Sequence, residues 1–245
     1  MTIYAVGDIH GQIGELDRVL KLIEADGGTD AEIVFLGDYV DRGSDSRGVI
    51  DRLIAGLESG RPWTCLKGNH DRMMEWFFEE EPRHDPHLLI GFHWLHERIG
   101  GLETLASYGV EPGPQARLNT FQREARAHIP KSHLDFLKQL KITHELTDLF
   151  FVHAGIRPEV PLAEQKEEDL LWIRQPFHKY SGPHPKLVVH GHTPVEAVTH
   201  YGNRVNTDSG AGYGNKLVPV VFEGSSVFTL NDSGRELLTP LGSLA

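Results

Sequence analysis

The sequence predicts an α/β fold in which buried strands alternate with helices. Short apolar segments recur at Ile3–Val6, Glu32–Leu36 and Trp63–Leu66. Runs of this length are typical of strands that are covered on both faces. The stretches between them carry apolar residues at helical spacing instead. This alternation indicates parallel strands joined by right-handed crossovers.

The composition is that of a globular protein. The chain has 245 residues, of which 39% are hydrophobic and 24% charged, so it can bury a large core and does not read as disordered. Its formal net charge of −11 argues against a general nucleic-acid binder, which needs a basic face. The single cysteine, Cys65, excludes an internal disulfide framework and a four-cysteine zinc site. We expect Cys65 to be a small buried side chain.

No targeting or membrane segment is expected. The opening MTIYAVGDIHG has no basic stretch followed by a long apolar one. No apolar run approaches the roughly 20 residues that a transmembrane helix needs. We therefore expect a cytoplasmic, bacterial protein without a membrane partner.

Two amphipathic helices are predicted between the first three strands, over Ile13–Glu24 and Asp45–Leu57. Each places its apolar residues on one face, which should pack on the sheet. These residues are Leu16, Val19, Leu20 and Ile23 in the first helix, and Val49, Ile50, Leu53, Ile54 and Leu57 in the second.

The pattern changes over about residues 79–145. Helical stretches are predicted at Phe92–Ser107, Ala116–His128 and Lys131–Leu140, with prolines between them and no strand. We interpret this segment as a helical, cap-like insertion within one domain that spans residues 1–245.

Strand patterns return after the insertion and are closely spaced. Gly, Ser, Asn and Asp turns join the last of them, which favours antiparallel, meander-like pairing. The predicted strands are Leu149–His153, Leu187–His190, Arg204–Thr207, Val218–Phe222 and Val227–Leu230.

Polar residues interrupt the apolar strands at their carboxyl ends. In open α/β sheets the functional crevice lies beside these ends, so the polar side chains should converge there. Each cluster alone fits a turn, a helix cap or a core histidine, but their occurrence in order favours one common site. The clusters are GDIHG at 7–11, GDYVDRG at 37–43, GNHD at 68–71, HAG at 153–155 and GHT at 191–193.

The residue types in these clusters suit a divalent metal. Asp8 and His10 are two residues apart, and on a strand this spacing would place both on the same side to chelate one ion. Mixed carboxylate, imidazole and amide ligands favour Mn²⁺, Fe²⁺ or Zn²⁺. Two such ions about 3.5–4 Å apart can activate water and hold the oxygens of an in-line displacement.

The five clusters, in this order, resemble the signature of the calcineurin-like metallophosphoesterases. GDYVDRG is similar to the form in the phosphoprotein-phosphatase branch, which includes bacterial and phage serine/threonine phosphatases and symmetrical dinucleoside tetraphosphatases. The resemblance covers about residues 2–216. It implies an αββα sandwich with mixed β-sheets and an α-helical insertion that borders the substrate cleft.

The resemblance also implies a site with two divalent metal ions, manganese first, with iron, zinc, nickel or cobalt as alternatives. Other metallophosphoesterases have Gly-His-x-His where this sequence has GHT. The absence of the second histidine fits the phosphoprotein-phosphatase branch. The implied ligands are Asp8 and His10 for the first ion, Asp38 between both ions, and Asn69, His153 and His192 for the second.

Further roles follow from the same resemblance. His70 would protonate the leaving oxygen, and Asp41 would orient His70 and raise its pKa. Arg42 would bind phosphoryl oxygens through its planar guanidinium group, together with Asn69. Arg174 resembles a second phosphate-contacting arginine.

The expected activity is metal-dependent hydrolysis of phosphate monoesters by direct attack of a metal-bridging hydroxide, without a phosphoenzyme. The main interpretation is a serine/threonine protein phosphatase-like enzyme, because Asp41 precedes Arg42, where the symmetrical tetraphosphatases often have Ala. The alternative is a dinucleoside polyphosphate (Ap4A-type) hydrolase. A second alternative is a non-catalytic metal-binding regulatory module.

The expected partner is a phosphorylated protein, a phosphopeptide or a nucleotide. No oligomeric state is predicted. His190 could either support a metal ligand or have a structural role, and the sequence does not decide between the two.

Overall fold

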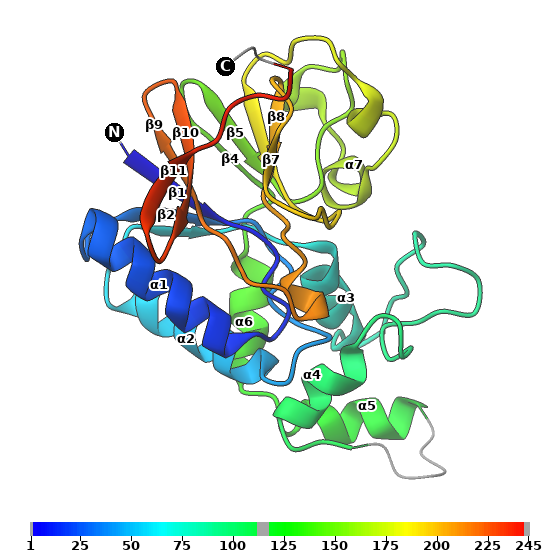
Figure 1. The fold of residues 1–245 in the computed structure, drawn as a ribbon. Coiled ribbons are helices and arrows are strands. Elements are labelled where there is room, and N and C mark those ends of the chain that lie inside the picture. The colour runs from blue at the N-terminus through cyan, green and yellow to red at the C-terminus, as the bar shows by residue number, and fades with distance from the viewer. Residues whose placement is uncertain (1, 112–117, 243–245) are drawn as a thin grey trace.

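The structure, a computed structural model, describes residues 2–111 and 118–242. Two β-sheets pack face to face, and helices cover their outer faces (Figure 1). The expected α/β class, with mixed sheets in an αββα arrangement, is therefore confirmed. The first two residues of the helix expected over 116–128 lie outside the described residues.

The first sheet is built around three parallel strands from the start of the chain. Its strands are β1 (Thr2–Val6), β2 (Glu32–Phe35), β3 (Trp63–Cys65), β9 (Val220–Glu223), β10 (Ser226–Asn231) and β11 (Gly234–Leu237). They are arranged in the order β11-β10-β9-β1-β2-β3. The last three strands extend the sheet in antiparallel fashion beside β1.

The second sheet is formed by the strands after the insertion. Its strands are β4 (Thr143–Glu145), β5 (Leu149–Val152), β6 (Leu187–His190), β7 (Thr199–His200) and β8 (Arg204–Asn206). They are arranged in the order β4-β5-β6-β8-β7. The central strands β5, β6 and β8 are parallel, so their carboxyl ends point in one direction.

The helices are α1 (Ile13–Gly27), α2 (Ser46–Glu58), α3 (Asn69–Phe77), α4 (Gly101–Ser107), α5 (Leu118–Arg126), α6 (Lys131–Gln139) and α7 (Glu167–Trp172). Helices α1 and α2 lie on the outer side of the first sheet, and α7 lies on the far side of the second (Figure 1). Within residues 2–111 and 118–242, every helix is too short or too polar to cross a membrane.

Alternation along the strands divides the core into layers. In β1, Tyr4 and Val6 pack with α1 and α2, whereas Ile3 and Ala5 pack between the two sheets. This is the expected result of the two-residue period of a strand. Both faces are apolar because both are covered.

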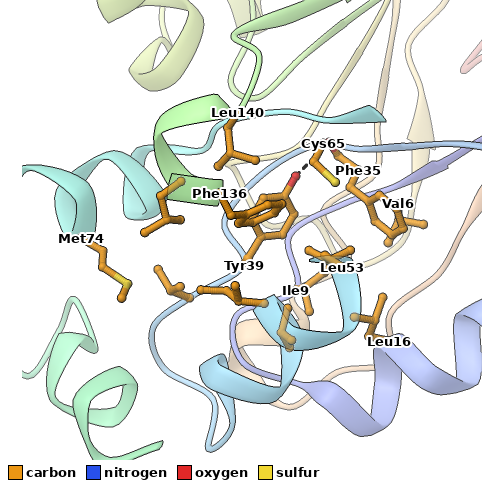
Figure 2. Packing of buried hydrophobic residues seen from close by; sticks show 14 of the residues in the cluster. Val6, Ile9, Leu16, Phe35, Tyr39, Leu53, Cys65, Met74, Phe136 and Leu140 are labelled. Carbon is orange, nitrogen blue, oxygen red and sulfur yellow. Dashed lines mark hydrogen bonds between the residues drawn. The ribbon is translucent and has the colours of Figure 1, made fainter. Parts of the chain in front are cut away.

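Tyr39 lies in the helix-side core. Figure 2 shows its ring among apolar side chains that include Phe35 and Phe136. Its hydroxyl group donates a hydrogen bond to the carbonyl oxygen of Leu66 at 2.7 Å. Cys65 is buried beside it, as expected.

The antiparallel pairing expected of the last strands does not extend to the second sheet. β5 pairs with β6, and β6 with β8, in parallel. The 153–186 connection between β5 and β6 is long enough for a crossover, which parallel strands require. Only β9, β10 and β11 form the expected meander.

The insertion also differs from expectation. α4 begins at Gly101 rather than at Phe92, because Gly91 and Gly100 have φ values of 86° and 95°, outside the helical region. β4 forms where no strand was expected, since Thr143–Glu145 pairs with β5.

Gly56 gives a test of how α2 packs on the sheet. A Cβ atom at Gly56 would lie 1.7 Å from Cζ3 of Trp63. We expect Gly56→Ala to lower the free energy of unfolding by about 1–3 kcal/mol through overpacking, although alanine favours a helix by about 1 kcal/mol over glycine. Gly14→Ala in α1, which meets open space, should be neutral or stabilising. Urea denaturation compares the two variants, and a Gly56→Ala protein as stable as the wild type would contradict this packing.

Candidate metal centre and active site

The polar clusters that follow five strands meet at one place in the structure. The backbone N–H of His10 donates to the carbonyl of Asp38 at 2.8 Å, and the N–H of His70 donates to Oδ1 of Asp38 at 2.9 Å. Nε2 of His153 lies 2.9 Å from Oδ1 of Asn69. Since these residues follow β1, β2, β3 and β5, the structure brings the strand ends together.

The turns that carry these side chains have unusual backbone conformations. Among the residues that the structure describes, the non-glycine residues at positive φ are His10 (47°), Asp38 (53°), Asp41 (74°), Arg42 (68°), Glu159 (65°) and His192 (67°). Such conformations are costly and concentrate at functional sites. All but Glu159 belong to the polar clusters, so the strain is local to this site.

Two groups of potential metal ligands share Asp38. His10, Asp38 and His70 form one group, and Asp38, His153 and His192 form the other; within each group the ligand atoms lie within 4.8 Å of one another. Every member is buried. Asp38 therefore lies between two neighbouring groups of nitrogen and oxygen donors.

Asn69 links the two histidines of the second group. Its Oδ1 atom lies 2.9 Å from Nδ1 of His192 and 2.9 Å from Nε2 of His153. Asn69 is the first residue of α3, and Asp71 in the same turn accepts hydrogen bonds from the N–H groups of Gly68, Asp38 and Tyr39. Asp71 thus holds the loop after β2 against the start of α3.

Asp8 lies outside both groups. β1 ends at Val6, so Asp8 and His10 lie in a turn and not on a strand, which corrects the expectation drawn from their spacing. The Asp8 carboxylate accepts the N–H of His192 at 3.1 Å, and burial, helped by the neighbouring Asp208, raises the pKa of Asp8.

Asp208 is a further buried residue of the site, in the loop 208–211, which by resemblance to bacterial members of the same family is expected to line the cleft. It is 3% exposed and follows β8 in the same way as the other clusters follow their strands. Its position directly after β8 agrees with that expectation. Burial raises the pKa of Asp208 to about 6.

The residues fit divalent cations. Burial, and after it the neighbouring carboxylates, raise the pKa of Asp8 well above its ordinary value, and burial and Asp71 do the same for Asp38. Nε2 of His192 is buried and has no hydrogen-bond partner among the described residues. Crowded carboxylates beside an unpartnered imidazole nitrogen form a donor set that suits a borderline-hard metal ion.

His70 and Asp41 form a close pair. Nδ1 of His70 lies 2.6 Å from Oδ2 of Asp41 and donates a hydrogen bond to it. Nε2 of His70 faces Arg42, whose Nη2 atom lies 3.1 Å away. Burial, and after it Arg42, lower the pKa of His70 well below its ordinary value. The net shift of the His70 pKa is therefore downward, opposite to the one expected from Asp41 alone.

A cavity of about 120 Å³ opens over this centre. Its floor combines metal-ligand candidates with Arg42 and His70, and its wall is partly apolar. The lining residues are Asp38, Arg42, Asn69, His70, Ile99, Trp172, Arg174, His192, Pro194 and Tyr213. Arg174 is exposed, so both predicted arginines line the same cavity.

Two aromatic residues of this wall were not predicted. Tyr213 is 67% exposed, and its ring centroid lies 5.0 Å from Cζ of Arg42. The turn that presents it packs closely on His10, because a Cβ atom at Gly212 would lie 2.5 Å from Cδ2 of His10. Trp172 donates its Nε1–H to Asp85 at 3.1 Å. No local motif identifies either residue as part of the wall.

His190 lies apart from the two ligand groups. Its Nε2 is 3.2 Å from Nη1 of Arg204, and its ring packs edge-on against Phe177 with centroids 5.0 Å apart. These contacts favour the structural role that the sequence left open.

Comparison with known proteins places these observations in a family. The model of the calcineurin-like phosphoesterases matches residues 1–222. A bis(5'-nucleosyl)-tetraphosphatase (asymmetrical), PrpE of Oceanobacillus iheyensis, is 25% identical over 91% of this chain and 89% of its own. A solved structure provisionally assigned as a diadenosine tetraphosphatase has a TM-score of 0.64 at 21% identity, covering 93% of this chain and 92% of the other. A cold-active protein-tyrosine phosphatase of a psychrophilic Shewanella has a TM-score of 0.63 at 16% identity, covering 97% and 80%.

The last two similarities reflect the fold alone, whereas the family match covers most of the sequence. The chain therefore belongs to the calcineurin-like phosphoesterase family and is a metal-dependent hydrolase of phosphoester bonds.

Proposed function

We propose that this hydrolase cleaves dinucleoside polyphosphates. The observation that carries the proposal is the pairing of two kinds of group in one cavity: Arg42 and Arg174 suit a chain of phosphates, and Tyr213 and Trp172 offer aromatic surfaces to a base. The tetraphosphatase name of a relative that aligns over 91% of this chain supports the same substrate class.

Asp41 does not argue for a phosphoprotein substrate. Its side chain is 0% exposed, and its carboxylate contacts His70, Trp94 and Thr104. A group closed off from the cavity cannot contact the substrate. We therefore favour the alternative interpretation of the sequence over the serine/threonine phosphatase-like one.

We infer that two divalent ions would be held by the motif residues. Bound there, they would supply Lewis-acid stabilisation of phosphoryl charge and lower the pKa of a water molecule. The ligands would be Asp8, His10, Asp38, Asn69, His153 and His192.

The side chains around this centre would handle charge and protons. Arg42, which reaches both His10 and His70, would orient phosphoryl oxygens next to Nε2 of His70. An anionic substrate at this position favours the protonated imidazole, which offsets the effect of burial. His70, with Nδ1 held by Asp41, would then give its Nε2 proton to the leaving oxygen.

A substrate comparison tests the proposal. After chelation and re-addition of Mn²⁺, kcat/KM is measured for diadenosine tetraphosphate, a phosphoserine peptide and p-nitrophenyl phosphate. We expect the dinucleotide to exceed the peptide by about tenfold or more, which corresponds to 1.4 kcal/mol of additional transition-state binding. Chromatography of the products distinguishes two ADP from ATP plus AMP. Preference for the peptide would reinstate the phosphatase interpretation, and inactivity with every substrate and metal would favour the regulatory module.

Tyr213 allows a sharper test of the aromatic wall. Tyr213→Ala should raise KM for diadenosine tetraphosphate about tenfold with little change in kcat, since stacking of a base is worth about 1–3 kcal/mol. Glycerol phosphate, which has no ring, should be unaffected, and Tyr213→Phe should behave as the wild type. Equal losses for both substrates would mean that Tyr213 only supports Arg42.

A further inference from the structure

The helical insertion contributes directly to the environment of the His70–Asp41 pair. Nε1–H of Trp94 lies 3.0 Å from each oxygen of Asp41, and the Thr104 hydroxyl donates to Oδ1 of Asp41 at 2.8 Å. Trp94 is 4% exposed and Thr104 is 0% exposed. Trp94 therefore approaches both oxygens of Asp41, including the Oδ2 atom that faces His70, and Thr104 approaches Oδ1.

The backbone around Asp41 is held by the same segment. The N–H of Asp41 donates to the Thr104 hydroxyl at 2.8 Å, and the N–H of Arg42 donates to the carbonyl of Gly100 at 3.4 Å. Asp41 and Arg42 both have left-handed backbone conformations, which need support from their surroundings.

Two adjacent glycines permit this close approach. A Cβ atom at Gly100 would lie 2.3 Å from the backbone nitrogen of Arg42, and one at Gly101 would lie 2.5 Å from the carbonyl oxygen of Trp94. Gly100 thus lets the insertion pack against the Asp41–Arg42 turn, and Gly101 lets the backbone of Trp94 pack against the start of α4.

We propose that Trp94 and Thr104 are positioning residues for the proton donor of this hydrolase, so that the insertion completes the catalytic site. They hold the Asp41 carboxylate in one orientation, and Asp41 in turn holds His70 with Nε2 toward the cavity. The inference rests on the proposed acid role of His70 and not on the identity of the nucleotide substrate.

The expected signature is a dependence on the leaving group. A misplaced acid slows the departure of a basic oxygen, such as that of phenyl phosphate, more than that of p-nitrophenolate, which leaves readily without a proton. We expect Trp94→Phe and Thr104→Val each to lower kcat for phenyl phosphate about tenfold, as for loss of one hydrogen bond to a charged group. Turnover of p-nitrophenyl phosphate should change much less, and KM should stay the same for both.

Matched variants separate positioning from folding. Thr104→Ser keeps the hydroxyl group and should restore activity. Trp76→Phe is the matched control for Trp94→Phe, because Trp76 packs between Arg72 and Arg83, away from Asp41. It should leave kcat unchanged for phenyl phosphate and for p-nitrophenyl phosphate. Thermal melting of each variant with Mn²⁺ establishes the folded fraction.

A double-mutant cycle gives the decisive result. In a His70→Asn background, Trp94→Phe and Thr104→Val should have no further effect on phenyl phosphate, because they act through the imidazole. Equal losses for both substrates, or losses that multiply with that of His70→Asn, would overturn the proposal. Neither readout requires diadenosine tetraphosphate to be a substrate, so the failure of the proposed function is seen separately.

Discussion

Asp38→Asn should reduce kcat by about a thousandfold or more, since metal ions contribute several kcal/mol of transition-state stabilisation and each 1.36 kcal/mol is tenfold in rate. Asp38 is the residue that the two ligand groups share. Its replacement therefore affects both proposed metal positions, whereas loss of any other ligand affects one. Turnover is measured at saturating Mn²⁺ with diadenosine tetraphosphate and with p-nitrophenyl phosphate. The exposed Asp30→Asn is the matched control and should retain full activity.

Stability provides an independent readout for the same variant. Because burial and Asp71 raise the pKa of Asp38, its charged form destabilises the metal-free fold at neutral pH. When the pKa of a carboxyl group is raised in the folded state, the protein loses stability as the pH rises above the unfolded pKa of about 3.9. Metal-free Asp38→Asn should therefore be more stable than the metal-free wild type, by more at pH 7.5 than at pH 5. Added Mn²⁺ should reverse the order, because only the wild type keeps the shared carboxylate.

Calorimetry in the presence and absence of EDTA measures these differences. An active Asp38→Asn protein, or one that gains as much stability from Mn²⁺ as the wild type does, would contradict the assignment of Asp38 to a metal centre. Loss of activity with unchanged metal stabilisation would point instead to an effect on His70, whose N–H donates to Asp38.

His70→Asn should show the second large effect. General acid catalysis contributes about 10²–10⁴-fold, so kcat for phenyl phosphate should fall by a factor in this range. The dinucleotide releases a phosphate oxygen that is less basic than an alkoxide, so its hydrolysis should fall less. The imidazole is buried beside Asp41 and Arg42. Asparagine at this position lacks the titratable proton donor and adds no charge.

The measurement compares kcat across aryl phosphates of graded leaving-group basicity. A steeper dependence in His70→Asn than in the wild type supports the acid role. A uniform loss across the series would assign His70 to ground-state binding of the phosphate, a role in which Arg42 would be its partner.

The sequence predicted the parts of the fold that depend on local patterns. α1 buries the apolar stripe expected of it, because a helix between a core and solvent carries its apolar residues on one face. α2 buries Val49, Ile50 and Leu53 as expected but leaves Leu57 exposed at its end. β1, β2 and β3 were predicted from short apolar runs, which are typical of strands covered on both faces. The parallel pairing of β5 with β6, and of β6 with β8, was not predicted. It depends on the path of a connection of 34 residues, 153–186, and not on the residues within the strands.

The site divides in the same way. Strand-end motifs located the residues from Asp8 to His192 because each lies within a few residues of a strand whose end is fixed by the sheet. The loop with Asp208 was expected to line the cleft, but Tyr213 follows β8 without a recognisable motif. Trp94 and Thr104 lie in a segment whose first helix was placed too early, so their distance from Asp41 could not be inferred.

The sequence by itself thus determined the chemistry of this protein: a set of carboxylates, imidazoles and an amide at the ends of parallel strands, with an arginine and a histidine beside them. Only the tertiary structure decided what surrounds that set. Trp94 and Thr104 are 53 and 63 residues from Asp41 along the chain, and their contacts arise from the packing of the segment 94–104 against the loop before α2. Ligand spacing is a local property of strands and turns, whereas the supporting contacts depend on long-range packing that no short motif encodes.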